Sequence, residues 1–141
     1  MRLLVLLALF LFSCEKETNS PITPTPPTPY RGVKSITYNS VNVDVVIDKP
    51  AKNEVDVLVV FHGTVLYDSE ILNAANNVLD KFKEILDRED MMIISVAYPG
   101  ENLLLGDNIV QAEAALLWVK NKANQELGIT IKKVFLAGHS Q

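Results

Sequence analysis

The chain has 141 residues, with 13 basic and 17 acidic side chains and a formal net charge of −4 at neutral pH. This mildly acidic composition offers no basic patch of the kind that nucleic-acid-binding domains carry, so we expect no nucleic acid among the partners. The single cysteine, Cys14, excludes an intramolecular disulfide. The sequence holds neither a Cys/His cluster nor a glycine-rich phosphate loop, and we therefore expect no metal and no cofactor.

Residues 1–13 have the form of a secretory signal peptide. Met1-Arg2 carries one positive charge, and an unbroken apolar stretch follows from Leu3 to Phe12. A stretch of about ten apolar residues is too short to span a bilayer as a helix. We therefore predict that the protein is exported.

The signal ends in Leu11-Phe12-Ser13-Cys14, which resembles the lipobox of bacterial lipoproteins. In that group cleavage before the cysteine leaves the cysteine to carry the lipid. The resemblance implies that Cys14 is lipidated and that it anchors the protein to a membrane, in the bacterial periplasm or at the outer membrane or cell surface. An ordinary signal with an incidental cysteine is the alternative.

Residues 14–30 are predicted to form a tether between this anchor and the folded part. The segment from Thr18 to Pro29 is rich in proline and threonine. It has too little apolar surface to fold and enough proline to stay extended. The folded domain is therefore expected over residues 31–141.

This domain begins with a predicted antiparallel hairpin. Its strands are Ser35 to Tyr38 and Val41 to Ile47, on either side of Asn39-Ser40. In the second strand apolar residues alternate with more polar ones, which is typical of a sheet covered on one face.

Three later segments are predicted to be central strands. They are Val55 to Phe61, Met91 to Ala97 and Val134 to Ala137, and nearly all of their residues are apolar. Such runs are typical of strands that are covered on both faces, as in parallel sheets.

Two helical patterns separate these strands. The first has its apolar stripe at Ile71, Ala75, Val78, Phe82 and Ile85, with Leu72, Leu79 and Leu86 beside it, and Asp68 or Ser69 as its cap. The second extends from about Asp107, its expected cap, to Leu127, and Gly128 suits a left-handed stop. Its predicted buried face consists of Ile109, Ala112, Ala115, Leu116 and Val119. Strands that alternate with helices predict a largely parallel α/β sheet with helices on both faces.

The final residues, Gly138-His139-Ser140-Gln141, match four positions of a G-x-S-x-G nucleophile elbow, and the sequence stops where the second glycine would stand. The apolar run before them is of strand type, and a sharp strand-to-helix turn is the setting that exposes a nucleophilic serine. Small neighbours allow the backbone to make that turn. Ser140 is therefore the candidate nucleophile.

The order of motifs resembles the α/β-hydrolase family. A strand ends in His62-Gly63, a helix, a strand and a helix follow, and the last strand ends in the serine motif. The likeness covers about Lys34 to Gln141 and only the N-terminal half of the family's domain. It implies the N-terminal part of an α/β-hydrolase fold, cut off after the nucleophile strand: an antiparallel hairpin, then a mostly parallel sheet.

The resemblance also implies an oxyanion hole made of two backbone amides. These would belong to Thr64 and to Gln141, the residue after the nucleophile, with Val65 a weaker candidate than Thr64. His62 and Gly63 would set the geometry of the loop. Amides of this kind stabilise the negative charge that develops on a substrate carbonyl oxygen.

A serine nucleophile needs a base, and the chain has only two histidines. His62 belongs to the oxyanion loop, and His139 precedes the serine on a tight turn, so its side chain diverges from that of Ser140. In the family the triad acid and histidine follow the serine in the chain. We therefore expect this polypeptide to be an inactive N-terminal fragment of a serine hydrolase that acts on a small-molecule ester or a peptide.

Two other functional hypotheses stay open at this point. One is a non-enzymatic lipoprotein or a binding module on a hydrolase-like sheet. The other is a nucleotide-binding α/β domain, which the absence of the expected glycine pattern disfavours. Tyr98, in the turn after the second central strand, either lines the acyl pocket or is a buried residue of its rim.

Overall fold

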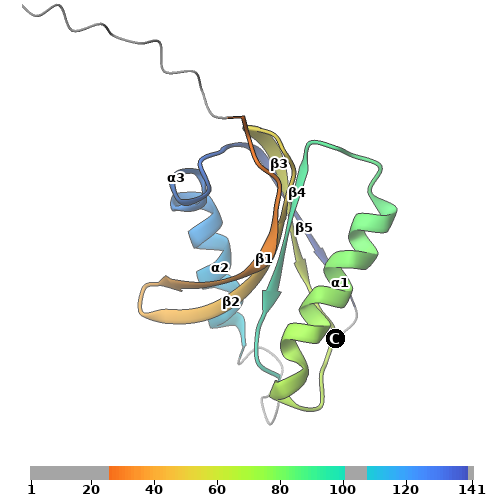
Figure 1. The fold of residues 1–141 in the computed structure, drawn as a ribbon. Coiled ribbons are helices and arrows are strands. Elements are labelled where there is room, and N and C mark those ends of the chain that lie inside the picture. The colour runs from red at the N-terminus through yellow and green to blue at the C-terminus, as the bar shows by residue number, and fades with distance from the viewer. Residues whose placement is uncertain (1–25, 101–107, 140–141) are drawn as a thin grey trace, which may run out of the picture.

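A computed structural model of the protein describes residues 26–100 and 108–139 (Figure 1). The predicted signal peptide and four residues singled out in the sequence, Cys14, Asp107, Ser140 and Gln141, lie outside the described residues. No helix in the described ranges is both long enough and apolar enough to cross a membrane.

The described residues form one five-stranded sheet in the order β1-β2-β4-β3-β5. Strands β1 and β2 form an antiparallel hairpin, β2 is antiparallel to β4, and β3 is parallel to both of its neighbours. The strands are β1 (Tyr30–Tyr38), β2 (Val41–Lys49), β3 (Glu54–Phe61), β4 (Met91–Ala97) and β5 (Thr130–Gly138). This mixed sheet confirms the predicted fold class.

The hairpin turn consists of Asn39 and Ser40, which both have positive φ, 48° and 65°. Two consecutive positive φ angles are what a two-residue type I′ turn requires, and this turn matches the twist of the flanking strands. The pairing of Tyr38 with Val41 closes the hairpin directly beside the turn.

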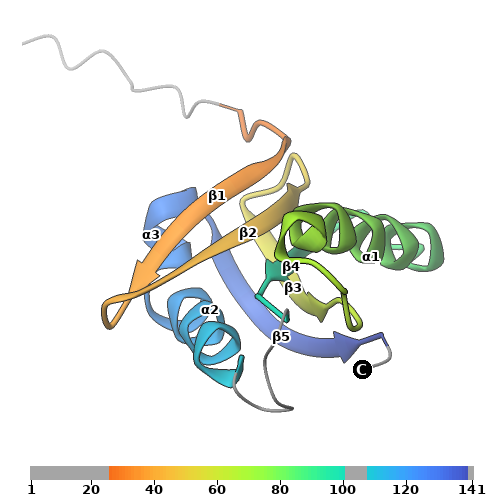
Figure 2. The ribbon, with the colours of Figure 1, turned by 90° about the horizontal axis from the view of Figure 1, so that it is seen from below.

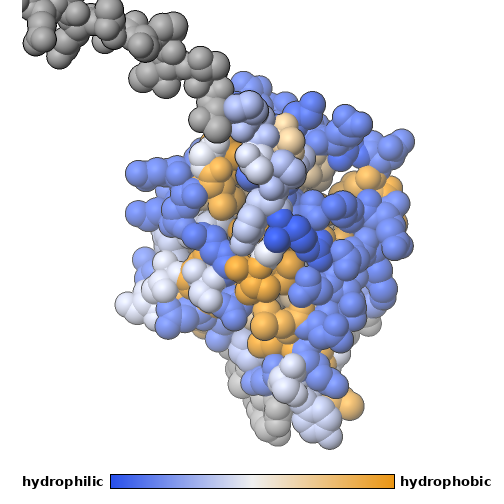
Figure 3. Space-filling model, viewed as in Figure 1, coloured by the Kyte–Doolittle hydropathy of each residue, from blue (hydrophilic) through white to orange (hydrophobic). Residues whose placement is uncertain are grey.

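Helices cover both faces of the sheet, as Figure 2 shows from the end of the strands. Helix α1 (Ile71–Ile85) lies on one face, and α2 (Ile109–Asn121) and α3 (Ala123–Leu127) lie on the other. On the α1 face, Ala75, Val78 and Leu79 pack against sheet residues such as Leu58 and Ile93. The solvent side of α1 is mostly hydrophilic, and apolar side chains are visible between helix and sheet (Figure 3).

Two predicted features of the first helix differ in the structure. Asp68 and Ser69 do not cap it, because they belong to a short 3₁₀ helix, η1 (Asp68–Glu70), that leads into α1. Ile85 was expected on the buried stripe but is exposed, because it lies in the last turn, beyond the helix residues that the sheet buries.

The second predicted helix is interrupted. Lys122, with φ −128° and ψ −34°, separates α2 from α3, and Gly128 ends α3 in the predicted left-handed conformation. The predicted buried face was partly wrong, since Ile109 is 65% exposed and Ala114 and Trp118 are buried. Apolar residues occur on nearly all sides of this helix, so periodicity alone does not select its buried face.

The environment of strand β5 differs from what its apolar composition alone indicates. The strand has the apolar sequence of a strand covered on both faces, yet Val134, Phe135 and Leu136 are 46%, 42% and 59% exposed. Among the described residues β5 pairs only with β3, so its other side is an edge. The two helical layers reach the sheet mainly through β1, β2, β3 and β4, and the described part of the chain leaves β5 largely uncovered.

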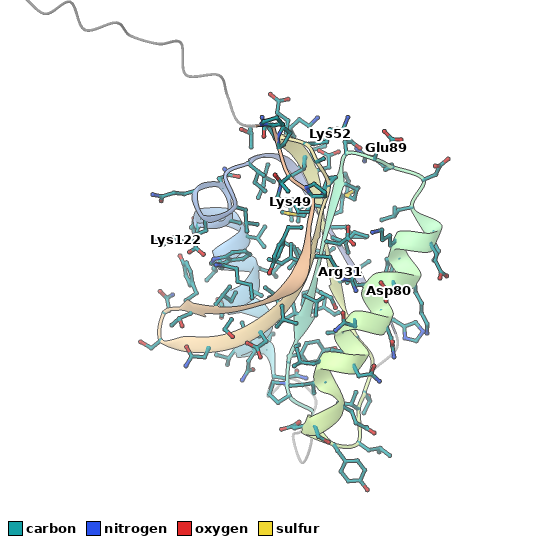
Figure 4. The ribbon with its side chains drawn as sticks, viewed as in Figure 1. Arg31, Lys49, Lys52, Asp80, Glu89 and Lys122 are labelled. Carbon is teal, nitrogen blue, oxygen red and sulfur yellow. The ribbon has the colours of Figure 1, made fainter. Side chains whose placement is uncertain are left out.

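Salt bridges tie the hairpin to α1. Arg31 of β1 and Asp80 of α1 point toward one another in Figure 4, with 3.0 Å between guanidinium nitrogen and carboxylate oxygen. Arg31 also contacts Asp48 of β2 at 3.3 Å. These exposed pairs fix orientation more than they add stability.

Candidate active site

The three parallel strands end at the same edge of the sheet. Phe61 of β3 pairs with both Val96 of β4 and Gly138 of β5, so the turns after these strands leave the sheet side by side. The backbone N–H of His139 donates to the carbonyl oxygen of Phe61 at 3.0 Å. In open α/β sheets this carboxyl edge is where ligands bind.

His62, the first residue after β3, is 3% exposed. Its Nδ1 lies 2.6 Å from the carbonyl oxygen of Gly63. A carbonyl oxygen only accepts hydrogen bonds, so Nδ1 carries a proton. The other ring nitrogen, Nε2, is buried and has no hydrogen-bond partner among the described residues. The histidine therefore holds its own loop, here called the His62–Val65 loop.

Tyr98 packs directly on this histidine. Its ring is stacked on the imidazole, with 4.1 Å between the centroids and 8° between the planes. Its hydroxyl donates to the backbone carbonyl oxygen of His62. Of the two positions considered from the sequence, the structure shows the buried one, because Tyr98 is 3% exposed.

The turn after β4 is held to both helical layers. The N–H of Gly100 donates to a carboxylate oxygen of Asp68 at 3.1 Å, and the side-chain amide of Asn108 donates to the carbonyl oxygen of Pro99 at 3.3 Å. Asp68, expected as a helix cap, thus bonds the neighbouring turn instead.

A cavity of about 310 Å³ opens beside the His62–Val65 loop. Such a volume lies at the lower end of the range for small-molecule sites. Among the described residues no carboxylate lines it, whereas Lys81 and two histidines do. The lining residues are His62, Gly63, Thr64, Val65, Ala74, Asn77, Val78, Lys81 and His139.

The described residues with perturbed pKa values lie away from this cavity. Hydrogen bonds from Arg88 hold the pKa of Asp90 below its ordinary value, and hydrogen bonds to Asp90 and Asp56 raise the pKa of Arg88. Asp56 and Asp90 lie near the amino ends of β3 and β4, at the opposite end of the sheet from His62. This cluster is structural.

The structure brings together the four residues that the sequence assigned to the oxyanion loop, His62, Gly63, Thr64 and Val65. His139, to which the sequence assigned no role in the site, lines the same cavity. Thr64 is exposed and His139 is exposed, whereas His62 is buried. Ser140 and Gln141 follow His139 but are outside the described ranges.

Sequence reasoning missed Asn77 and Lys81, which line the cavity from α1. With Ala74 and Val78 they follow the three- and four-residue spacing of one helix face, and this signal was available. The contact between Tyr98 and His62 had no such signal, because the two residues are 36 positions apart and both lie in turns.

Solved structures similar to this chain include several esterases. A thermostable esterase from Pseudomonas putida is 23% identical with a TM-score of 0.60, and 78% of this chain covers 34% of that one. A hyperthermophilic esterase from the archaeon Pyrobaculum calidifontis is 16% identical with a TM-score of 0.59, and 80% of this chain covers 35% of it. Est1E from Butyrivibrio proteoclasticus is 18% identical with a TM-score of 0.53, and the match covers 78% of this chain and 41% of Est1E.

Comparison with models of protein families and with curated proteins gave no match. The chain spans about a third of the length of the first two esterases. At these identities the likeness concerns the fold. The described residues thus form a partial α/β-hydrolase fold.

Proposed function

We propose that this chain is the N-terminal part of a serine hydrolase that cleaves carboxylic esters, with Ser140 as nucleophile. The observation that carries the proposal is the hydrogen bond between His139 and Phe61, 3.0 Å long, which sets the turn after β5 beside the His62–Val65 loop. A nucleophile and an oxyanion hole must lie side by side for acyl transfer. The esterases with the same fold support an ester as substrate, and a peptide bond is the second candidate.

In the proposed reaction, the hydroxyl oxygen of Ser140 attacks the ester carbonyl carbon while a base takes the hydroxyl proton, and the amides of Thr64 and Gln141 stabilise the oxyanion. Collapse of the tetrahedral intermediate breaks the ester C–O bond, the leaving oxygen takes the proton from the protonated base and departs as the alcohol, and water then hydrolyses the acyl-enzyme. Among the described residues, the N–H of Thr64 donates no hydrogen bond, so it is available to an oxyanion.

Neither histidine in these 141 residues is suited to act as the base. His62 is buried and uses Nδ1 to bond Gly63, and the backbone of His139 is bonded to Phe61 while its side chain is exposed. An unassisted serine hydroxyl is almost fully protonated at neutral pH. We therefore propose that these 141 residues alone have no appreciable turnover and that acid and base come from residues that follow in a longer product.

The test compares hydrolysis of p-nitrophenyl esters by the 141-residue chain and by the product of the complete gene. We expect turnover only from the complete product, with a burst of p-nitrophenol that equals the enzyme concentration. Turnover by the 141-residue chain that disappears in Ser140→Ala would show that it holds its own base. Complete product without activity on any ester or peptide would favour a binding module.

A further inference from the structure

Tyr98 makes two separate contacts with His62. Its ring stacks on the imidazole at 4.1 Å, and its hydroxyl donates to the backbone carbonyl oxygen of the same residue. Both residues are 3% exposed. One side chain from the turn after β4 thus fixes both the ring and the backbone of the first residue after β3.

The position of His62 determines the direction of the next amide groups. Its Nδ1–H donates to the carbonyl oxygen of Gly63 at 2.6 Å, so that carbonyl points toward the imidazole. No described peptide bond is cis. In a trans peptide the C=O and N–H groups point in opposite directions, and the N–H of Thr64 therefore points away from the imidazole. The direction of the Thr64 N–H group therefore depends on the orientation of the His62 ring.

We propose that Tyr98 is a positioning residue that holds the Thr64 amide in the direction an oxyanion requires. This inference rests on the proposed function. Oxyanion donors accelerate the reaction only when they are aligned before charge develops. Stacking stops the imidazole from rotating, and the tyrosine hydroxyl satisfies the buried carbonyl of His62, which would otherwise be free to turn its peptide. A tyrosine supplies both the flat apolar ring and the donor.

The test uses Tyr98→Phe and Tyr98→Leu in the product of the complete gene. Tyr98→Phe keeps the ring and loses the hydroxyl. We expect its kcat to fall about tenfold, which is less than the fall that the loss of a whole oxyanion donor causes. Its KM should change by less than about twofold, because substrate binding is not altered. Tyr98→Leu also loses the stacking, and its kcat should fall further. The rate of labelling by a fluorophosphonate should fall in parallel, while the final number of labelled sites stays at one per chain.

Tyr38→Phe is the matched control. The hydroxyl of Tyr38 accepts a hydrogen bond from Asn121 at 2.7 Å, and Tyr38 ends β1, which β2 and β4 separate from β3 in the sheet. This variant loses the same group and should keep the wild-type kcat. The proposal is overturned if Tyr98→Phe also keeps the wild-type kcat. It is overturned as well if the fall in the activity of Tyr98→Phe equals the fall in its number of labelled sites, because that would indicate misfolding.

The protonation site of His62 gives a readout that does not depend on activity. Imidazole ¹⁵N shifts of the wild type should show the proton on Nδ1, and Tyr98→Leu should show a mixture of the two tautomers. An unchanged tautomer in Tyr98→Leu overturns the positioning role. A wild type that neither hydrolyses esters nor reacts with the fluorophosphonate, but whose tautomer responds to Tyr98→Leu, would refute the proposed function and leave the positioning of His62 intact.

Discussion

Phe61 and Gly138 face each other as the last pair of the ladder between β3 and β5. The His62–Val65 loop and the turn that leads to Ser140 therefore leave the sheet at the same level. Parallel strands produce this arrangement, because their carboxyl ends lie at a common edge. The proposed chemistry follows from the register of two strands whose final residues are 77 positions apart in the sequence.

The hairpin turn offers a test of the local backbone. Ser40 has φ of 65°, a region that costs a non-glycine residue about 1 kcal/mol and glycine almost nothing. Ser40→Gly should raise stability by about 0.5 kcal/mol after the larger entropy of the unfolded glycine chain is subtracted. The change in stability is measured by thermal unfolding monitored with circular dichroism.

Ser40→Ala removes the same hydroxyl but keeps the strain, so it should bring no gain. An equal rise in both variants would mean that the serine side chain, and not the positive φ, is the cause.

Arg88 should matter for stability in a pH-dependent way. Its guanidinium bonds Asp56 at 2.7 Å and Asp90 at 2.9 Å, and Asp56 is 5% exposed. Arg88→Met should lower the unfolding midpoint at pH 7, because a buried carboxylate loses its partner.

The sign of the pH dependence follows from Asp90, whose pKa is lowered in the folded state mainly by the hydrogen bond from Arg88. The stabilisation is present above the unfolded-state pKa of aspartate, about 4, and is lost as the pH falls through the folded-state value. The difference between wild type and Arg88→Met should therefore shrink in acid. Lys83→Met, which breaks an exposed pair with Asp48, is the control and should change little at any pH. If the stability difference between wild type and Arg88→Met stayed the same in strong acid, the hydrogen bond from Arg88 to Asp90 would not be its cause.

The exposed edge at β5 should promote self-association of the 141-residue chain. Val134, Phe135 and Leu136 present apolar side chains along an edge that has no partner strand among the described residues. Unpaired apolar edges recruit other strands. Leu136→Lys should shift sedimentation profiles toward monomer, because a lysine on an edge opposes strand addition.

Ile85→Lys is the control, since Ile85 is also apolar and is more exposed than Leu136, 75% against 59%, but lies on α1. It should leave the profile unchanged. A wild-type chain that sediments as one monomeric species and unfolds cooperatively would contradict the expected association and favour a stand-alone binding module.

Membrane attachment through Cys14 remains a proposal from the sequence, and fractionation tests it. Two or three acyl chains hold a protein firmly, whereas one is marginal. We expect the wild type in the membrane fraction, with incorporated radioactive palmitate, and Cys14→Ser in the soluble fraction. Equal processing and equal membrane recovery of both would rule out lipidation.

Much of the fold was predictable because its elements have strong local signals. The run from Met91 to Ala97 is apolar throughout, and it forms β4 with those bounds. The helix stripe from Ile71 to Ile85 matches the extent of α1. The hairpin strands are longer than predicted, since β1 begins at Tyr30. The residues there include Arg31 and Gly32, which do not indicate a strand because one is charged and the other is flexible. They nevertheless belong to β1, because their backbone pairs with β2.

The site was less predictable than the fold. His62 and Gly63 stand out because they directly follow a strongly apolar strand, but the stacking of Tyr98 on His62 depends on how two distant turns approach in space. Periodicity reports which residues share a face of one element and contains no information on contacts between turns.

Labelling by a fluorophosphonate tests the central claim, that Ser140 is a hydrolase nucleophile, most directly. The product of the complete gene should take up one label per chain, and peptide mapping should find it on Ser140. Ser140→Ala should take up none, while Ser69→Ala, which changes an exposed serine beside α1, should react as the wild type does. Equal labelling of Ser140→Ala, or a label mapped to another residue, would contradict the account.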